Sequence, residues 1–163
     1  MPSIIQQALK QETPFSSVEQ EVFLGIQLAA HRTLAPWADH LRTAANLSPS
    51  QYNVLRILRG VHPDTMACGE ISERMISREP DMTRLLDRLA KRDLVMRERG
   101  SDDRRSVRVR ISEGGLTLLS ALDEAAREMP RRLLGPIGTA QLRSLAALVG
   151  VVIQRAAAVS ELS

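Results

Sequence analysis

The stretch Ser77–Ser112, SREPDMTRLLDRLAKRDLVMRERGSDDRRSVRVRIS, carries the patterns that decide the fold. In its first part, four apolar residues recur at helical spacing: Met82, Leu85, Leu86 and Leu89. Three basic residues follow the same period on the opposite side: Arg84, Arg88 and Lys91. This arrangement predicts a helix whose apolar face packs on a core while its cationic face stays exposed.

The second part of the same stretch predicts a β-hairpin. Three apolar residues alternate with two arginines in the period-two pattern of a half-buried strand: Val107, Arg108, Val109, Arg110 and Ile111. A partner strand is expected from Leu94, with the turn at residues 100–103. A helix followed by a basic hairpin has a shape suited to a nucleic-acid duplex.

The basic residues are concentrated in this stretch. The whole chain has 22 Lys and Arg against 19 Asp and Glu, a net charge of only +3. Between Arg84 and Arg110, however, ten basic residues face five acidic ones. Because phosphate attraction depends on the local potential and not on the total charge, this segregation predicts double-stranded DNA as the partner.

Composition argues against several other classes of protein. Hydrophobic residues make up 44% of the 163 residues and charged ones 25%, as in ordinary globular proteins. The N-terminus lacks the uninterrupted apolar core of a signal peptide, and no run approaches the roughly 20 apolar residues of a membrane span. We therefore expect a cytoplasmic, nucleoid-associated protein with no membrane partner.

The sequence offers no machinery for catalysis. It contains no Gly-rich phosphate loop, H-E-x-x-H or G-x-S-x-G motif. His31 and His40 lie nine residues apart, which places them on opposite sides of one helix. We predict that the protein is not an enzyme and that it has no catalytic, cofactor-binding or metal-binding residues.

The single cysteine, Cys68, excludes an intramolecular disulfide and a Cys-based zinc finger. Its place at the start of a predicted helix makes redox sensing one interpretation. A partly buried bystander is the favoured interpretation, because free cysteine is among the most buried residue types.

Helix signals precede the decisive stretch. A long helix is expected from Ser16 or Ser17 to Asn46, with a kink at Pro36. The next helix should start at Ser48, with Pro49 in its first turn, and end at Gly60. Residues 61–67 are expected to form a loop, followed by a short helix in GEISERMI.

The two helices on either side of residues 77–79 form the predicted helix-turn-helix. The first lies in GEISERMI, and the second is expected from Pro80 to about Arg92. Two helices joined by such a short turn must cross at a steep angle. The first would then support the second, which inserts into the duplex.

Two further helices are expected after the hairpin. One starts at Ser112 and Glu113 and should be limited by Pro130, and the last starts near Thr139. The last helix is apolar on a broader face than one small domain needs, which makes a dimer interface a reasonable hypothesis.

The predicted fold class is mainly α with a small β-hairpin wing. We expect a winged helix-turn-helix DNA-binding domain with N- and C-terminal dimerisation helices. The expected parts are residues 1–46, an N-terminal dimerisation segment with the long first helix, residues 47–112, the DNA-binding lobe, and residues 113–163, the C-terminal dimerisation helices.

These features resemble the MarR family of bacterial winged-helix transcription regulators, over about residues 17–155. Five residues stand at the spacing of the family's D-x-R-x-x-x-V-x-L-T wing pattern: Asp103, Arg105, Val109, Ile111 and Ser112. The run MTRLLDRLAKRDLVMR is similar to the family's recognition helix and first wing strand. Asp93 stands where the family typically has glycine, and Asp tolerates a left-handed backbone better than most residues.

The resemblance implies a homodimer formed by the terminal helices. Each subunit would place its recognition helix in a major groove and its wing along a minor groove. It also implies a ligand pocket between the dimerisation helices and the DNA-binding lobe, for which Trp37, His40 and Tyr52 are the candidates, although core packing explains Trp37 and Tyr52 equally well.

The candidate DNA-binding residues are Ser77, Glu79, Asp81, Thr83, Arg84, Arg88, Lys91, Arg104 and Arg105. Arg84 would grip guanine in two places or bind a phosphate. Ser77 would reach a base or only cap the helix, and Arg88 and Lys91 suit phosphates or solvent.

At the tip of the wing, Arg105 suits a narrow minor groove, with Arg104 beside it. The alternative is a solvent-exposed turn arginine. Because phosphate repels a carboxylate, Asp103 would support the wing by orienting Arg105 or pairing with another arginine.

The sequence and the resemblance together predict a transcriptional regulator, most simply a repressor, that binds a two-fold symmetric operator. The resemblance implies that it acts as a homodimer and is released by a small-molecule effector. The alternative is a winged-helix module for protein–protein assembly, whose wing arginines meet an acidic protein.

Overall fold

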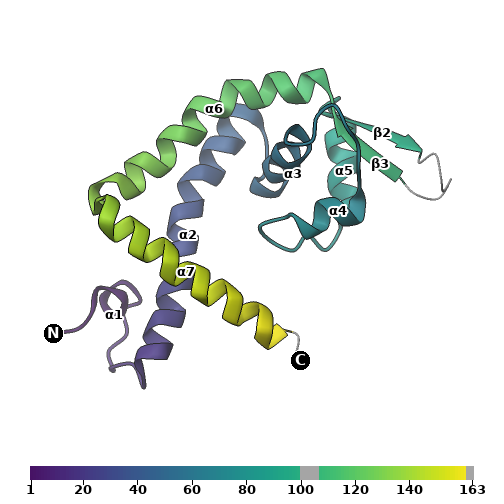
Figure 1. Ribbon diagram of the computed structural model, residues 1–163. Coiled ribbons are helices and arrows are strands. Elements are labelled where there is room, and N and C mark those ends of the chain that lie inside the picture. Colours follow the sequence, from purple (N-terminus) through teal and green to yellow (C-terminus); the bar gives the residue numbers. More distant parts are fainter. Residues whose placement is uncertain (100–106, 161–163) are drawn as a thin grey trace. The chain divides into compact units, whose positions relative to one another are not determined.

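The computed structural model describes residues 1–99 and 107–160, and it is mainly helical with one small antiparallel sheet (Figure 1). The chain divides into two compact units, residues 1–120 and 121–163. The first unit contains α1 (Ile4–Ala8), α2 (Val18–Ala45), α3 (Pro49–Arg59), β1 (Met66–Ala67), α4 (Cys68–Glu73), α5 (Met82–Ala90), β2 (Val95–Arg99), β3 (Val107–Ile111) and the start of α6 (Glu113–Leu134). This is the predicted winged helix-turn-helix fold.

Helix α2 begins and ends at the predicted residues. The Ser17 hydroxyl accepts a hydrogen bond from the Gln20 amide at 3.2 Å, which caps the first turn. Asn46 ends the helix in the left-handed region, with φ of 49°. The helix continues through Pro36, and α1 packs on it where Gly25 leaves room for the Ile5 side chain.

Helix α3 confirms the clearest start signal in the sequence. The Ser48 hydroxyl accepts from the Gln51 amide at 3.2 Å, and the Gln51 side chain accepts from the Ser48 amide at 2.9 Å. Pro49 occupies the first helical position, where its missing N–H removes no helical hydrogen bond. Gly60 follows as the C-cap, as predicted.

The sheet has three strands in the order β1-β3-β2, all antiparallel. The hairpin pairs Val95 with Ile111 and Arg97 with Val109, so β2 and β3 form the predicted wing arms. Strand β1 pairs Met66 with Val109 on the other side of β3. The prediction of a loop at residues 61–67 missed β1, because a strand of two residues has no periodicity to detect.

The buried core of the first unit lies among α2, α3, α4, α5 and the sheet. Its fully buried side chains include Leu41, Val54, Leu55, Leu58, Ile71, Leu85, Leu86, Leu89, Val109 and Ile111. The apolar face predicted for α5 is therefore confirmed. Figure 1 shows α3, α4 and α5 grouped beside the β2–β3 hairpin.

The start of α6 is fitted tightly against the end of α5. A Cβ on Gly115 would lie 2.3 Å from the Leu94 carbonyl oxygen, so only glycine fits there. The Ser112 hydroxyl accepts from the Gly115 amide at 3.1 Å and donates to the Asp93 carbonyl. Asp93 has φ of 53°, which confirms the left-handed backbone expected at this position.

The second unit contains the end of α6, η1 (Gly135–Ile137) and α7 (Thr139–Ser160). The prediction that Pro130 limits α6 is wrong, because the helix continues to Leu134. A proline removes one helical hydrogen bond, but its fixed φ is that of a helix, so the turns after it form normally. Helix α7 starts at Thr139, as predicted.

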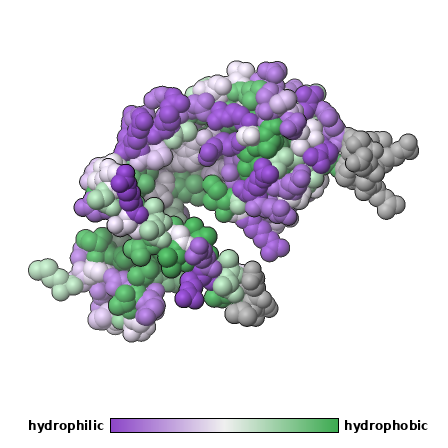
Figure 2. Space-filling view, in the orientation of Figure 1, coloured by the Kyte–Doolittle hydropathy of each residue, from purple (hydrophilic) through white to green (hydrophobic). Residues whose placement is uncertain are grey.

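Helix α7 lies at the surface along its whole length. None of its residues is buried, and Leu148 and Ile153 are 65% and 64% exposed. Figure 2 shows hydrophobic residues gathered on its surface. Among the described helices, α7 is the one whose length and mean hydropathy of 1.6 would allow it to cross a membrane, contrary to the expectation that no such segment exists.

Candidate nucleic-acid interface

The connection between α4 and α5 is longer than the predicted turn at residues 77–79. Helix α4 ends at Glu73 and α5 begins at Met82, so residues 74–81 join them. Asn53 of α3 holds this connection, because its side-chain oxygen accepts from the Ile76 amide at 2.9 Å. The Ile76 side chain itself is 86% exposed. No pattern in the sequence pointed to Asn53, which lies 23 residues away.

Helix α5 presents one buried and one exposed face. Its apolar residues lie in the core, whereas Thr83, Arg84, Arg88 and Lys91 are exposed. In the described part of the chain, no hydrogen bond or ion pair joins the side chain of Arg88 or of Lys91 to another residue. The exposed face of α5 is therefore positively charged and open to a partner.

Asp81 caps α5 and also faces Arg84. Its Oδ1 accepts from the Arg84 amide at 3.0 Å, and its Oδ2 lies 3.5 Å from Arg84 Nε. The Arg84 side chain remains 82% exposed. The suggestion that Ser77 caps this helix is wrong, since Asp81 immediately precedes the first turn and Ser77 is exposed in the connection.

Several of the basic side chains between Arg84 and Arg110 are bonded to other residues of the protein. Arg92 donates to the carbonyl oxygens of Ala45 and Asn46 at 2.8 and 2.7 Å, and so closes the C-terminal end of α2. Arg97 on β2 pairs with Asp87 on α5. These cations fasten α2, α5 and the sheet together, so the positive charge available to a partner is smaller than the sequence count.

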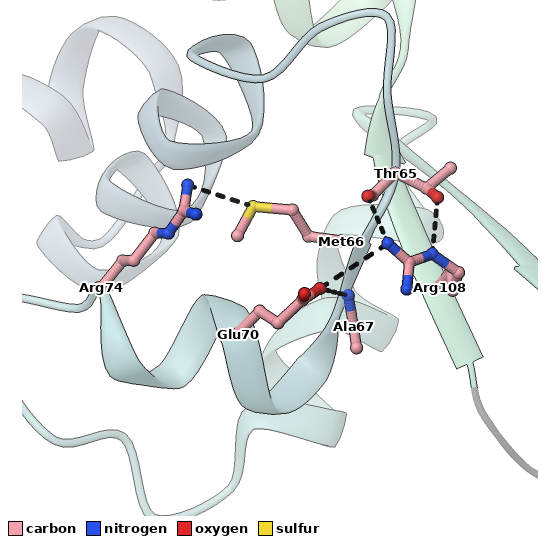
Figure 3. A network of polar contacts seen from close by, with 6 residues as sticks. All are labelled: Thr65, Met66, Ala67, Glu70, Arg74 and Arg108. Atoms are coloured by element: carbon pink, nitrogen blue, oxygen red, sulfur yellow. Dashed lines mark hydrogen bonds and ion pairs between the residues drawn. The ribbon is translucent and has the colours of Figure 1, made fainter.

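The two arginines of β3 are also engaged. Arg110 donates to Glu98 of β2 at 2.6 Å, across the hairpin. Arg108 turns instead toward β1 and α4, where its Nε donates to the Thr65 hydroxyl at 2.8 Å and its terminal nitrogen to the Thr65 carbonyl at 2.7 Å. Figure 3 shows the Arg108 guanidinium between Thr65 and Glu70.

The tip of the predicted wing lies outside the described residues. Asp103, Arg104 and Arg105 all fall within residues 100–106, so their predicted roles stay predictions. Sequence reasoning also left out Arg78, which is exposed in the connection before α5. Its position beside Ser77 was the available signal, but the basic cluster was counted only from Arg84.

The three residues predicted to line a ligand pocket do lie together. The rings of Trp37 and His40 stack with centroids 5.5 Å apart, and Trp37 meets Tyr52 edge to face at 5.1 Å. Arg56 lies 5.9 Å from the centre of the Tyr52 ring. This aromatic cluster joins α2 to α3, and Tyr52 is buried while Trp37 and His40 are partly exposed.

The described residues hold no group of three or more His, Cys, Asp and Glu side chains that would suit a metal ion. Cys68 is half-buried at the first position of α4. The candidate site consists of the exposed basic face of α5 and the hairpin beside it.

Comparison with known proteins identifies this arrangement. Residues 47–107, from α3 to the wing, match the MarR family. One similar protein is a MarR transcription factor from Planctomyces limnophilus whose crystal structure is known. Its sequence is 38% identical to this chain and its structure matches with a TM-score of 0.64, over 85% of this chain and 99% of that one. The chain belongs to the MarR family of winged helix-turn-helix transcriptional regulators.

Further matches extend over most of the chain. The HTH-type transcriptional regulator PecS of Dickeya dadantii is 26% identical over 150 residues, which cover 91% of this chain and 90% of PecS. The fold also matches S. aureus MepR in a DNA complex, with a TM-score of 0.72 and 18% identity over 80% of this chain and 94% of that one. This MarR-family protein is a DNA-binding transcription regulator and not an enzyme.

Proposed function

We propose that this MarR-family regulator acts as a homodimeric repressor that binds a two-fold symmetric operator, with one α5 helix in each of two successive major grooves. The observation that carries the proposal is the division of α5 into a buried apolar face and an exposed basic face. A helix held on a core by one face presents the other to a groove without losing stability.

Arg84 is the residue that reads a base. It stands in the first turn of α5, is largely exposed, and has a guanidinium able to bind both acceptors of guanine. Ser77, Glu79, Asp81 and Thr83 lie at the same end of the helix and within reach of neighbouring base edges. Arg88 and Lys91 bind phosphates, because they stand further along the exposed face.

The wing adds a second contact. Strands β2 and β3 lead directly into residues 100–106, which contain Asp103, Arg104 and Arg105. Arg105, with Arg104 beside it, enters the minor groove, where a narrow groove concentrates negative potential. Asp103 orients Arg105 and does not touch DNA, since phosphate repels it.

A second copy of the chain covers the apolar residues of the terminal helices. Phe23 of α2 is 67% exposed, and α7 has no buried residue. Exposed apolar surface of this extent marks an interaction site. In this proposal residues 1–46 and 113–163 form the dimer, and residues 47–112 form the DNA-binding lobe.

A small-molecule effector releases the DNA by binding beside the aromatic cluster of Trp37, His40 and Tyr52. The cluster supports this part of the proposal because two of its three rings remain partly exposed. It joins the long helix of the dimerisation segment to α3 of the DNA-binding lobe. A ligand there would change how these two elements pack.

Selection of bound duplexes from a random library tests the function, because the bound sequences themselves reveal the operator. The expected product is a symmetric site with half-sites about one helical turn apart. A protein–protein module would enrich no sequence, and that result would overturn the proposal.

The same selection with Arg84→Ala tests the base-reading role. Preference should relax at one position of each half-site, because a bidentate contact to guanine discriminates by about 1–3 kcal/mol. Arg88→Ala is the matched control, and it should weaken binding to all sequences alike. A uniform loss for Arg84→Ala would reassign Arg84 to a phosphate.

A further inference from the structure

Arg108 belongs to the basic pattern of the wing, yet its side chain is already occupied. It donates two hydrogen bonds to Thr65, at 2.8 Å to the hydroxyl and 2.7 Å to the carbonyl, and lies 3.7 Å from Glu70 Oε2. About two-fifths of the side chain is exposed. A guanidinium held on two sides in this way has little freedom to reach a phosphate.

The partners of Arg108 belong to the helix-turn-helix. Glu70 lies in the first turn of α4, and its carboxylate accepts from the Ala67 amide at 2.6 Å, which caps that helix. Ala67 in turn pairs with Arg108 in the sheet. One carboxylate therefore both starts α4 and meets the wing arginine (Figure 3).

This network joins two short elements, each of which also contributes one buried side chain to the core, Ile71 from α4 and Met66 from β1. Helix α4 has only six residues, too few to be stable alone, and β1 has two. The last residues of α4 lead into the connection that places α5. A change at Arg108 would therefore alter both the position of the wing relative to α4 and the first turn of the helix-turn-helix.

We propose that Arg108 is a positioning residue that locks the wing to α4 through Thr65 and Glu70, so that the wing and the recognition helix approach DNA as one rigid body. The inference rests on the proposed function, because it assumes that the wing contacts the duplex. Arg110, two residues along the same strand, is bonded within the hairpin and does not reach α4 in this way.

Glu70→Gln tests the inference through the sign of its effect. The amide oxygen still caps α4, but the charge that holds Arg108 is lost. If Arg108 positions the wing, affinity for the selected operator should fall by up to about fivefold, because the partly exposed ion pair that orients Arg108 is lost. If Arg108 binds a phosphate, removal of a nearby carboxylate should strengthen binding, and that result would overturn the inference.

Arg108→Gln and Arg110→Gln form a matched pair, since each removes one charge from β3. Arg108→Gln should weaken operator binding about tenfold, as expected when charged hydrogen bonds are lost, and leave the salt dependence unchanged. Arg110→Gln should have a smaller effect. A fall of about one unit per subunit in the salt slope for Arg108→Gln would show a direct phosphate contact and contradict the inference.

A triple variant separates positioning from a general folding defect. In a background with Arg104→Ala and Arg105→Ala, Arg108→Gln should cause little further loss, because the tip contacts that it places are already absent. An equal loss in both backgrounds would show that Arg108 serves stability alone. If the unmodified protein selects no duplex, the proposed function fails, and the inference fails with it for a distinguishable reason.

Discussion

Helices α5 and α7 both carry many apolar residues, but only α5 places them in the core of its own chain. Four of its nine residues are buried, whereas α7 has 22 residues and none buried. A short helix is stable only when its apolar face is packed. This contrast is the reason for the proposal that a second copy of the chain covers α7.

The largest expected effect is the loss of stability when an apolar residue of α5 is truncated, compared with the same truncation in α7. Leu89→Ala should lower the free energy of unfolding by about 2–5 kcal/mol, because it opens a cavity in a packed core. Leu148→Ala should change it by less than about 0.5 kcal/mol in dilute protein, since Leu148 is exposed there. Urea unfolding followed by the fluorescence of Trp37, the single tryptophan, measures both. Equal losses would mean that α7 packs within its own chain.

A charge placed on α7 tests whether its exposed apolar residues lie in a dimer interface. Leu148→Glu should weaken the dimer by about 3 kcal/mol or more, because an unpaired carboxylate would be buried in the interface. Sedimentation equilibrium measures the change in mass.

Gln154→Glu is the matched control on the same helix, because it adds the same charge at a position that is already polar. Unchanged dimer mass in Leu148→Glu would remove α7 from the interface. Recovery of the unmodified protein with membranes would instead assign the apolar surface of α7 to a lipid bilayer.

Two basic residues near the end of α5 separate stability from DNA binding. Arg92→Ala should lower the free energy of unfolding by about 1–3 kcal/mol, because two carbonyl oxygens at the end of α2 lose a charged donor. Arg88→Ala should leave it within about 0.5 kcal/mol but reduce the salt slope of DNA binding by about one unit per subunit. Thermal unfolding and binding titrations at several salt concentrations measure the two effects. A loss of stability in Arg88→Ala, together with a changed salt slope in Arg92→Ala, would contradict the division into structural and DNA-binding cations.

The smallest expected effect is a gain in stability at Asp93. Asp93→Gly should raise the free energy of unfolding by up to about 1 kcal/mol, because glycine relieves a left-handed backbone at φ of 53°. Asp93→Ala should lower it instead. Thermal unfolding of the pair checks the prediction, and a change of the same sign in both would show that the carboxylate and not the backbone matters.

Local patterns predicted the local features of the fold. The apolar face of α5 and the cap at Ser48 each follow from residues a few positions apart, whereas the left-handed backbone at Asp93 was expected from the resemblance to the family. The exposed basic face of α5 followed from the same periodicity. Sequence reasoning therefore predicted which face of α5 is buried and which is exposed.

Such local patterns could not predict contacts between residues far apart in the sequence. The bonds from Arg92 to Ala45 and from Arg108 to Thr65 join residues more than 40 positions apart. Nothing near Arg92 or Arg108 in the sequence distinguishes them from arginines that stay free. For this reason, sequence reasoning counted structural cations as part of the DNA-binding charge.

The mass of the protein–DNA complex tests the central claim most directly. A duplex carrying the selected symmetric site, titrated with the protein and examined by native mass spectrometry, should bind two chains without a populated one-chain complex. Leu148→Glu should give that one-chain complex at much lower affinity. A single chain bound at full affinity would contradict the proposed dimer, because each recognition helix would then act without its partner.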